Sequence, residues 1–263
     1  MIVDVDGVAA HATTGGIVPN PADPAILMVH GAGCDATIWQ QQTRYLAHRG
    51  MQAIAVDLPG HGKSAGEPLA TVADQADWLV RFMDSCGVEE ATLVGHSMGA
   101  FIVLEAAARL GNRCRSLVLM GAALTMPVHP QLLADADNDV AAAAALMVAW
   151  GHAKPAHTGL NPTPGMWMTG GARALIERSQ PGVLATDLQA GLSYDDGPET
   201  AAAVKAATTV LLGLDDRMTP ARSGRELAAL LPYVNVIELP RVGHFMMTEA
   251  PRQVRAAILE SAI

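Results

Sequence analysis

The sequence predicts an α/β protein with a mostly parallel, doubly wound sheet. Short apolar runs rich in Val, Ile and Leu recur without alternation, which is typical of strands buried on both faces of a parallel sheet. Stretches with helical periodicity lie between these runs, and this order favours helices on both faces. Half of the 263 residues are hydrophobic and only 16% are charged, so the chain can bury one large core. The expected strands are 25–30, 52–56, 91–94, 116–120, 208–212 and 234–239.

The first 20 residues follow a different pattern. They alternate more between apolar and polar side chains, and they contain Asp6-Gly7, a favourable two-residue hairpin turn. We therefore expect an antiparallel hairpin at one edge of the sheet.

One expected helix is marked at both ends. Thr71 and Asp74 form a capping-box pattern at its start, and Gly87 is a stop signal at its end. Further helices are expected at 38–48, 98–110, 220–231 and 251–261, the last two with proline at or near the first turn.

The alternation of strand and helix stops between residues 123 and 206. This stretch is rich in proline and contains an alanine-rich helix candidate at 139–150 but no convincing strand. Connections between elements usually span only about 4 to 6 residues, so we interpret the stretch as an inserted helical lid. The strands that flank it should then be neighbours in one sheet. The expected division is core 1–122, lid 123–206 and core 207–263.

The charge of the chain excludes several classes of partner. With 26 acidic and 17 basic residues the formal net charge is −9, so nucleic acid and anionic membrane surfaces are not attracted. The longest apolar run, 140–150, is far shorter than the roughly 20 residues that span a bilayer. The N-terminus lacks the pattern of a secretory signal, and we expect a cytoplasmic protein.

The cysteines and the paired histidines do not indicate a metal centre. Cys34, Cys86 and Cys114 are odd in number and widely spaced, so we expect free thiols and no disulfide framework. His152 and His157 have no carboxylate or cysteine pattern beside them. We expect neither a metal nor a cofactor.

The strongest chemical motif is GHSMG at residues 95–99. It follows the expected strand 91–94 and opens the expected helix 98–110, which is the context that the G-x-S-x-G pattern requires. A sharp turn there exposes the serine hydroxyl above the sheet, and the two glycines leave room for crossing backbone. Ser97 is therefore the candidate nucleophile.

A serine nucleophile needs a histidine base within hydrogen-bond reach. His244 follows the last expected strand on a loop at its carboxyl end, where open α/β sheets gather their catalytic groups. His30, His61 and His96 lie near the same edge, but each belongs to a glycine-rich turn where a structural role is expected. We take His244 as the candidate base.

The base in turn needs an acid that orients it. The acid should come from the end of a strand between the serine and the histidine, and only the strand 208–212 is followed by carboxylates. These are Asp215 and Asp216, and spacing alone does not choose between them.

An anion site is expected at HGAG, residues 30–33. This glycine-rich turn follows a strand and presents backbone N–H groups where a tetrahedral oxyanion would form, and the Met98 N–H would be a second donor. A phosphate loop is the alternative, but the third glycine of GxGxxG is absent and Asp35 lies where a phosphate would be.

Together these motifs resemble those of the α/β-hydrolase superfamily, over nearly the whole chain. The order of serine, aspartate and histidine matches the family order, and residues 57–64 (DLPGHGKS) are similar to its D-x-P-G-x-G-x-S loop. The resemblance implies an α/β-hydrolase fold with an inserted helical lid. It selects Asp216 as the acid, from its position between Gly213 and Pro220. It also selects Ala32 as the residue of the HGAG turn whose N–H is an oxyanion donor together with that of Met98.

The resemblance also implies a reaction. We expect a serine hydrolase that cleaves small to medium apolar carboxylic esters, or thioesters, through an acyl-enzyme, as a monomer or homodimer. Serine at the nucleophile position disfavours haloalkane dehalogenases and epoxide hydrolases, which use aspartate. Two alternatives stay open. One is a C–C hydrolase of ring-cleavage products, although these typically carry asparagine where this chain has His96, and the other is a non-catalytic ligand receptor.

Methionine is frequent, with 13 in the chain against three phenylalanines and three tyrosines. A methionine-lined pocket adapts to varied apolar shapes, so we expect tolerance for uncharged apolar acyl groups and poor turnover of highly charged esters. The candidate substrate-binding residues are Met126, Met147, Trp150, Met166, Trp167, Met168, Met218 and Phe245.

Overall fold

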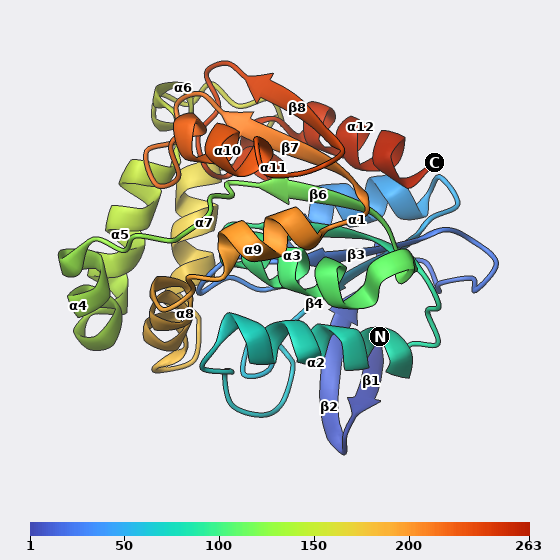
Figure 1. Cartoon of the computed structure of the whole chain (residues 1–263). Helices are drawn as coiled ribbons and strands as arrows, with labels where there is room; N and C mark the ends of the chain where they lie inside the picture. The colour runs from blue at the N-terminus through green and yellow to red at the C-terminus, as the bar shows by residue number, and fades with distance from the viewer.

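The computed structural model describes residues 1–263 as an eight-stranded sheet with helices on both faces (Figure 1). The spatial order is β1-β2-β4-β3-β5-β6-β7-β8. The pairs β1–β2 and β2–β4 are antiparallel, and the other pairs are parallel, as the sequence predicts. The strands are β1 (Ile2–Val5), β2 (Val8–Thr13), β3 (Ala25–Val29), β4 (Gln52–Val56), β5 (Ala91–His96), β6 (Cys114–Met120), β7 (Ala207–Gly213) and β8 (Val234–Leu239).

The predicted hairpin forms at the N-terminal edge. Val5 pairs with Val8 across a two-residue turn, and Asp6 and Gly7 both have positive φ, at 54° and 83°. These angles are those of the turn that matches the twist of the flanking strands.

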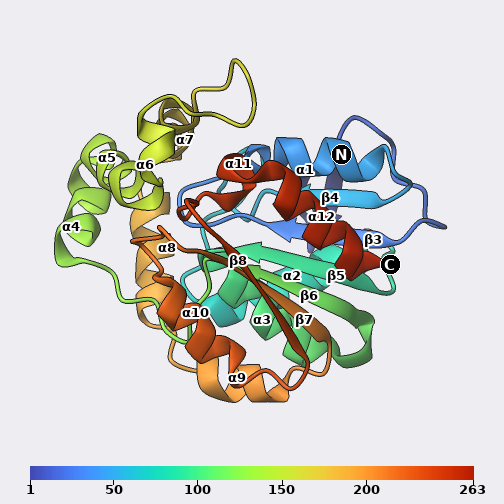
Figure 2. The ribbon, with the colours of Figure 1, turned by 90° about the horizontal axis from the view of Figure 1, so that it is seen from above.

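Helices cover both faces of the sheet (Figure 2). The predicted cap of α2 is confirmed, because the Thr71 hydroxyl accepts the Asp74 N–H at 3.0 Å and donates to the Asp74 carboxylate at 2.7 Å. One face carries α1 (Gln40–Ala47) and α12 (Pro251–Ala262), and the other carries α2 (Val72–Ser85), α3 (Met98–Leu110), α9 (Gly197–Ala203) and α10 (Ala221–Ala228). Short helical turns are η1 (Ala36–Trp39), η2 (Gly111–Arg113) and α11 (Met246–Glu249).

Strand β8 differs from the expectation of burial on both faces. Val234 and Val236 are each 39% exposed. The reason is its position, because β8 is the last strand of the sheet and has a neighbour on one side only. The strands β3, β4 and β5 in the middle of the sheet are buried throughout.

The inserted segment, residues 123–206, contains helices and no strand. As expected, β6 and β7 on either side of it pair directly in the sheet. Helices α4 to α8 gather at one end of the sheet in both views, whereas α9 returns to pack on α3 (Figures 1 and 2). None of the helices is both long and apolar enough to cross a bilayer. The further helices are α4 (Pro130–Asn138), α5 (Val140–Gly151), α6 (Lys154–His157), α7 (Met168–Glu177) and α8 (Val183–Leu192).

Candidate active site

Ser97 lies at a sharp turn between β5 and α3. Its backbone has φ 55° and ψ −122°, a positive φ that residues with a side chain rarely adopt. A Cβ on Gly99 would lie 2.5 Å from the carbonyl oxygens of Val29 and His30, and a Cβ on Gly95 would overlap the Gly99 backbone. The two glycines of the motif therefore allow the helix to cross close to the sheet, which creates the strained turn at Ser97.

His244 and Asp216 form a buried pair. The imidazole Nδ1 lies 2.8 Å from the Asp216 Oδ2, and the two residues are 2% and 5% exposed. Asp216 Oδ1 accepts the backbone N–H groups of Met218 and Thr219, both at 2.8 Å, which fixes the carboxylate. Asp215 is exposed. Of the two aspartates that spacing leaves open, the structure brings Asp216 to the imidazole.

His96 connects the surroundings of Ser97 with those of His244. A Cβ on Gly31 would lie 3.0 Å from the Ser97 Cβ and 3.1 Å from His96 Nδ1, while the His96 ring centroid is 4.6 Å from that of His244. On the other side, a Cβ on Gly121 would lie 2.7 Å from His244 Cε1. No direct hydrogen bond joins Ser97 to His244 in this structure, and such bonds often tighten only when substrate binds.

His96 contacts the backbone of His244, the candidate base. Its Nε2 lies 2.9 Å from the His244 carbonyl oxygen, so this nitrogen carries the hydrogen. Burial, with the charge of His244, lowers the pKa of His96 well below its usual value, and the ring is neutral at physiological pH. The structural role expected for this histidine is therefore one of support for the loop that carries the base.

The HGAG turn lies beside the nucleophile. Ala32 is buried and lines the same cavity as Ser97. Met98 is the first residue of α3, so the helix itself does not use its N–H. His30 stabilises the turn, because its Nδ1 donates to the Gly31 carbonyl at 2.9 Å and its Nε2 accepts the Leu58 N–H at 3.3 Å. Burial and the nearby His61 lower the pKa of His30 to about 4, which keeps this ring neutral as well.

A cavity of about 260 Å³ opens beside Ser97. Met126, Met147, Trp150 and Met218 line it, so the structure brings four of the candidate substrate-binding residues to the nucleophile. None of the lining residues is acidic. The others are Ala32, Pro127, Val128, His129, Leu132, Leu188, Arg217 and Thr219.

The structure does not bring the other four candidates to this cavity. Met166, Trp167 and Met168 line a separate hollow against η1, and Trp167 is 76% exposed. Phe245 is 1% exposed, and its ring stacks on that of His152 with the two centroids 4.6 Å apart. It therefore packs in the interior beside His244 instead of lining the cavity. Their position in the sequence, within the inserted segment or next to His244, does not determine which way the backbone turns each side chain.

Glu249 is a residue that no motif in the sequence predicted. Its Oε2 accepts the backbone N–H groups of Ala153 and Gly243, at 2.9 and 3.2 Å, and so joins the inserted segment to the loop that carries the base. Burial raises the pKa of this carboxyl to about 7. The same junction includes a hydrogen bond of 2.6 Å from the His244 N–H to the Gly151 carbonyl.

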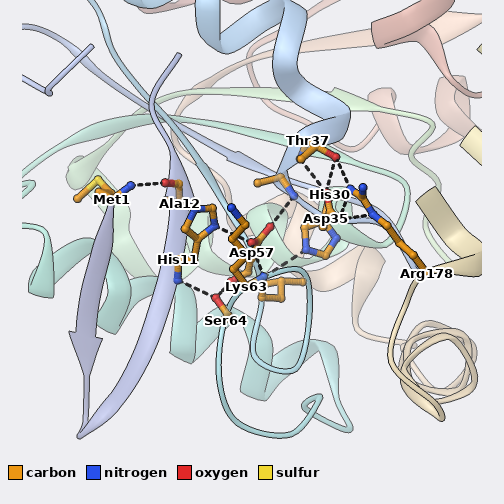
Figure 3. Close-up of polar contacts among 12 residues, drawn as sticks. Met1, His11, Ala12, His30, Asp35, Thr37, Asp57, Lys63, Ser64 and Arg178 are labelled. Atoms are coloured by element: carbon orange, nitrogen blue, oxygen red, sulfur yellow. Dashed lines mark hydrogen bonds and ion pairs between the residues drawn. The ribbon is translucent and has the colours of Figure 1, made fainter. Parts of the chain in front are cut away.

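Asp187 is a second missed residue. It is fully buried in α8, and its carboxylate lies 2.8 Å from His61 Nε2. A signal was present in the sequence, because Leu184, Asp187 and Leu188 have the spacing of an apolar helix face with one charge placed in it. Arg178, also in the inserted segment, pairs with Asp35 at 2.6 Å farther out (Figure 3).

The fold and this site define a class of protein. A strained serine turn after a central parallel strand, beside a buried histidine–aspartate pair, is the arrangement of the α/β hydrolases. The family model described as "Alpha/beta hydrolase family" matches residues 26–257, and the chain belongs to this family. It is a hydrolase.

Known relatives and solved structures agree with this assignment. The chain is 29% identical to "Putative carbamate hydrolase RutD" from Caulobacter sp. (strain K31), over 97% of this chain and 95% of that protein. Its fold is similar to the enol-lactonase from Burkholderia xenovorans LB400, with a TM-score of 0.87 and 20% identity over 99% of both chains. It is also similar to the 2-hydroxy-6-oxo-6-phenylhexa-2,4-dienoate hydrolase from Rhodococcus sp. strain RHA1, with a TM-score of 0.80 and 21% identity over 99% of this chain and 96% of that one.

Proposed function

We propose that the protein is a serine hydrolase that cleaves small to medium apolar carboxylic esters through an acyl-enzyme. The observation that carries the proposal is that Ser97, on its strained turn, lines one cavity together with Ala32 and directly follows His96, whose ring centroid is 4.6 Å from that of His244, the partner of Asp216. The proposal assigns the nucleophile, the base, the acid and the oxyanion donors all to residues of this chain.

The geometry supports the following mechanism. The Ser97 oxygen attacks the ester carbonyl carbon, and its proton passes to His244 Nε2. The Ala32 and Met98 N–H groups stabilise the oxyanion, and Asp216 stabilises the imidazolium. The imidazolium then protonates the departing alkoxide. A water molecule, deprotonated by His244, cleaves the acyl-enzyme, which releases the carboxylic acid and restores Ser97.

The cavity supports the substrate class. Its volume of about 260 Å³ is at or below the lower end of the range for ligand pockets, which favours small to medium esters. Methionine side chains adapt to different apolar shapes, and Met126, Met147 and Met218 are three of the lining residues. Lactones and carbamates, which the names of two similar proteins mention, contain an acyl carbonyl open to the same attack and belong in the substrate panel.

The test combines a substrate panel with one variant. Nitrophenyl esters with acyl chains of increasing length should be hydrolysed by the wild type, whereas Ser97→Ala should lower kcat by about 10⁴-fold or more in a folded protein. A fluorophosphonate probe should label the wild type at Ser97 and leave the variant unlabelled. Near-normal turnover by a folded Ser97→Ala variant would overturn the proposal.

The same panel separates the two alternatives. A ring-cleavage diketone that is turned over faster than any ester would favour C–C hydrolysis. A protein that binds ligands in the cavity but neither turns over an ester nor reacts with the fluorophosphonate would be a receptor.

A further inference from the structure

Asp187 connects the inserted segment to the HGAG turn. Its Oδ2 accepts two hydrogen bonds of 2.8 Å, one from the Gly33 backbone N–H and one from His61 Nε2. The side chain is fully buried, and its Oδ1 has no partner. A single carboxylate oxygen on α8 therefore binds two loops of the core.

The hydrogen-bond partners of His61 define its charge. Its Nδ1 lies 2.9 Å from the Pro59 carbonyl oxygen and its Nε2 faces the Asp187 carboxylate, so both nitrogens carry hydrogen. Burial lowers the pKa of His61, but the charge and hydrogen bond of Asp187 outweigh it and the pKa is raised. A buried ion pair thus lies directly behind the turn.

Stability alone is a poor explanation for this pair. A buried ion pair usually adds little compared with apolar side chains of the same shape, because both charges lose their hydration. Leu184, one turn before Asp187, and Leu188, the next residue, are also buried in α8, so the buried face of this helix does not itself require a charge. The hydrogen bonds that the carboxylate accepts explain its presence better.

The Asp187 carboxylate holds the peptide group that follows Ala32. Gly33 has a positive φ of 65°, and the Cys34 N–H closes the turn on the Gly31 carbonyl at 3.1 Å. The bond from Gly33 to Asp187 fixes the orientation of the Ala32–Gly33 peptide within this turn. Helix α8 also packs against the turn itself, because a Cβ on Gly33 would lie 2.8 Å from Leu184 Cδ1.

We propose that Asp187 is a positioning residue that holds the oxyanion turn in its catalytic conformation from the inserted segment. The proposal rests on the proposed function, because it concerns the donor that Ala32 supplies. It gives the inserted segment a part in transition-state stabilisation in addition to its part in lining the cavity.

Asp187→Leu is the decisive variant, because leucine has a similar shape and accepts no hydrogen bond. We expect kcat to fall about 10- to 100-fold with little change in KM, since a displaced donor loses part of the 10²- to 10³-fold that an oxyanion donor contributes. The affinity for a boronic acid, which mimics the tetrahedral state, should fall by a similar factor. Asp187→Asn, whose amide oxygen can accept both bonds, should restore most of kcat.

Arg178→Met is the matched control. Arg178 also joins the inserted segment to the core, but it contacts the side chains of Asp35 and Thr37 and no backbone of the turn (Figure 3). We expect its kcat within about threefold of the wild type. Equal losses in Arg178→Met and Asp187→Leu, or a loss of kcat without a loss of boronic acid affinity, would overturn the positioning role.

The Gly33 amide gives a readout that needs no variant and no turnover. In the wild type it should exchange its hydrogen with solvent as slowly as the amides of β3, although it lies in a loop. Exchange at the rate of an open loop would overturn the proposal even if Asp187→Leu failed to fold. Absence of ester turnover in the wild type would instead count against the proposed function alone.

Discussion

The two neighbouring aspartates after β7 differ in environment, and this difference predicts different catalytic roles. Asp216 is buried against His244, whereas Asp215 is exposed. Asp216→Asn should lower kcat by about 10⁴-fold, because the imidazolium loses its counter-charge and the ring can adopt the wrong tautomer. Asp215→Asn is the matched control and should change kcat less than threefold. Steady-state kinetics of both variants measure the difference, and a reversed order would assign the acid to Asp215.

Glu249 makes the stability of the protein depend on pH. The pKa of this carboxyl is raised from 4.5 to about 7, with burial as the main cause and Asp216 adding to it. The folded state therefore holds the proton more tightly than the unfolded state, and stability is greatest below the unfolded pKa. It should decrease by up to about 3 kcal/mol as pH rises from about 4.5 to about 7, and stay constant above that.

Glu249→Gln tests this dependence. The amide oxygen can still accept the Ala153 and Gly243 N–H groups, but the side chain does not ionise. Thermal unfolding midpoints measured between pH 4 and 8 should lose the decline that Glu249 contributes in the wild type. A variant that keeps the same decline would show that other groups cause it.

At the scale of elements, Gly99 is a residue of α3 that lies close to the end of β3. Gly99→Ala would place a Cβ 2.5 Å from the carbonyl oxygens of Val29 and His30. Overpacking of this kind lowers the free energy of unfolding by about 1–3 kcal/mol or more. Gly171→Ala is the control, because Gly171 is also helical but has open space around it. That variant should gain roughly 0.5–1 kcal/mol. Chemical denaturation of both variants gives the two values, and similar values would contradict the close crossing.

The elements that the sequence predicts well are those with local causes. The start of α2 follows from the Thr71 hydroxyl and the Asp74 backbone, and the hairpin follows from Asp6-Gly7, so three or four residues carry each signal. Burial of β8 was overestimated because its composition resembles that of the inner strands, and only the strand order shows it to be an edge. Helix α11 has no distinct signal of its own.

The same limit applies to the site. The turn at Ser97 and the place of His244 after the last strand were predictable from motifs, because each is defined by a strand end and its next few residues. The contacts of Asp187 with Gly33 and of Glu249 with Ala153 join residues 154 and 96 positions apart. No local sequence pattern around these residues predicts which distant residue each one contacts. The sequence could have shown that Asp187 is buried, but not what it binds.

At the scale of the whole molecule, the inserted segment is held to the core on both sides of the cavity. Asp187 and Arg178 of the inserted segment contact the loop region after β3, and Gly151 and Ala153 of the same segment contact His244 and Glu249. We therefore expect the inserted segment to hold its position on the core before substrate arrives. The rate with tributyrin should rise hyperbolically and show no jump at the solubility limit of the ester. A jump there would mean that a lipid surface opens the segment.

The pairing of β6 with β7 has a consequence for the order of folding. Residues 121–206 lie between these strands, so the two partners begin far apart in the unfolded chain. Each doubling of the length of such a loop adds about 0.6 kcal/mol to the entropic free-energy cost of bringing its ends together. Pairs such as β3 with β4 close much shorter loops and can form first. The last two strands, whose ends lead to Asp216 and His244, should therefore join the sheet late, so that the turn at Ser97 forms before the two groups that we propose to activate it are in place.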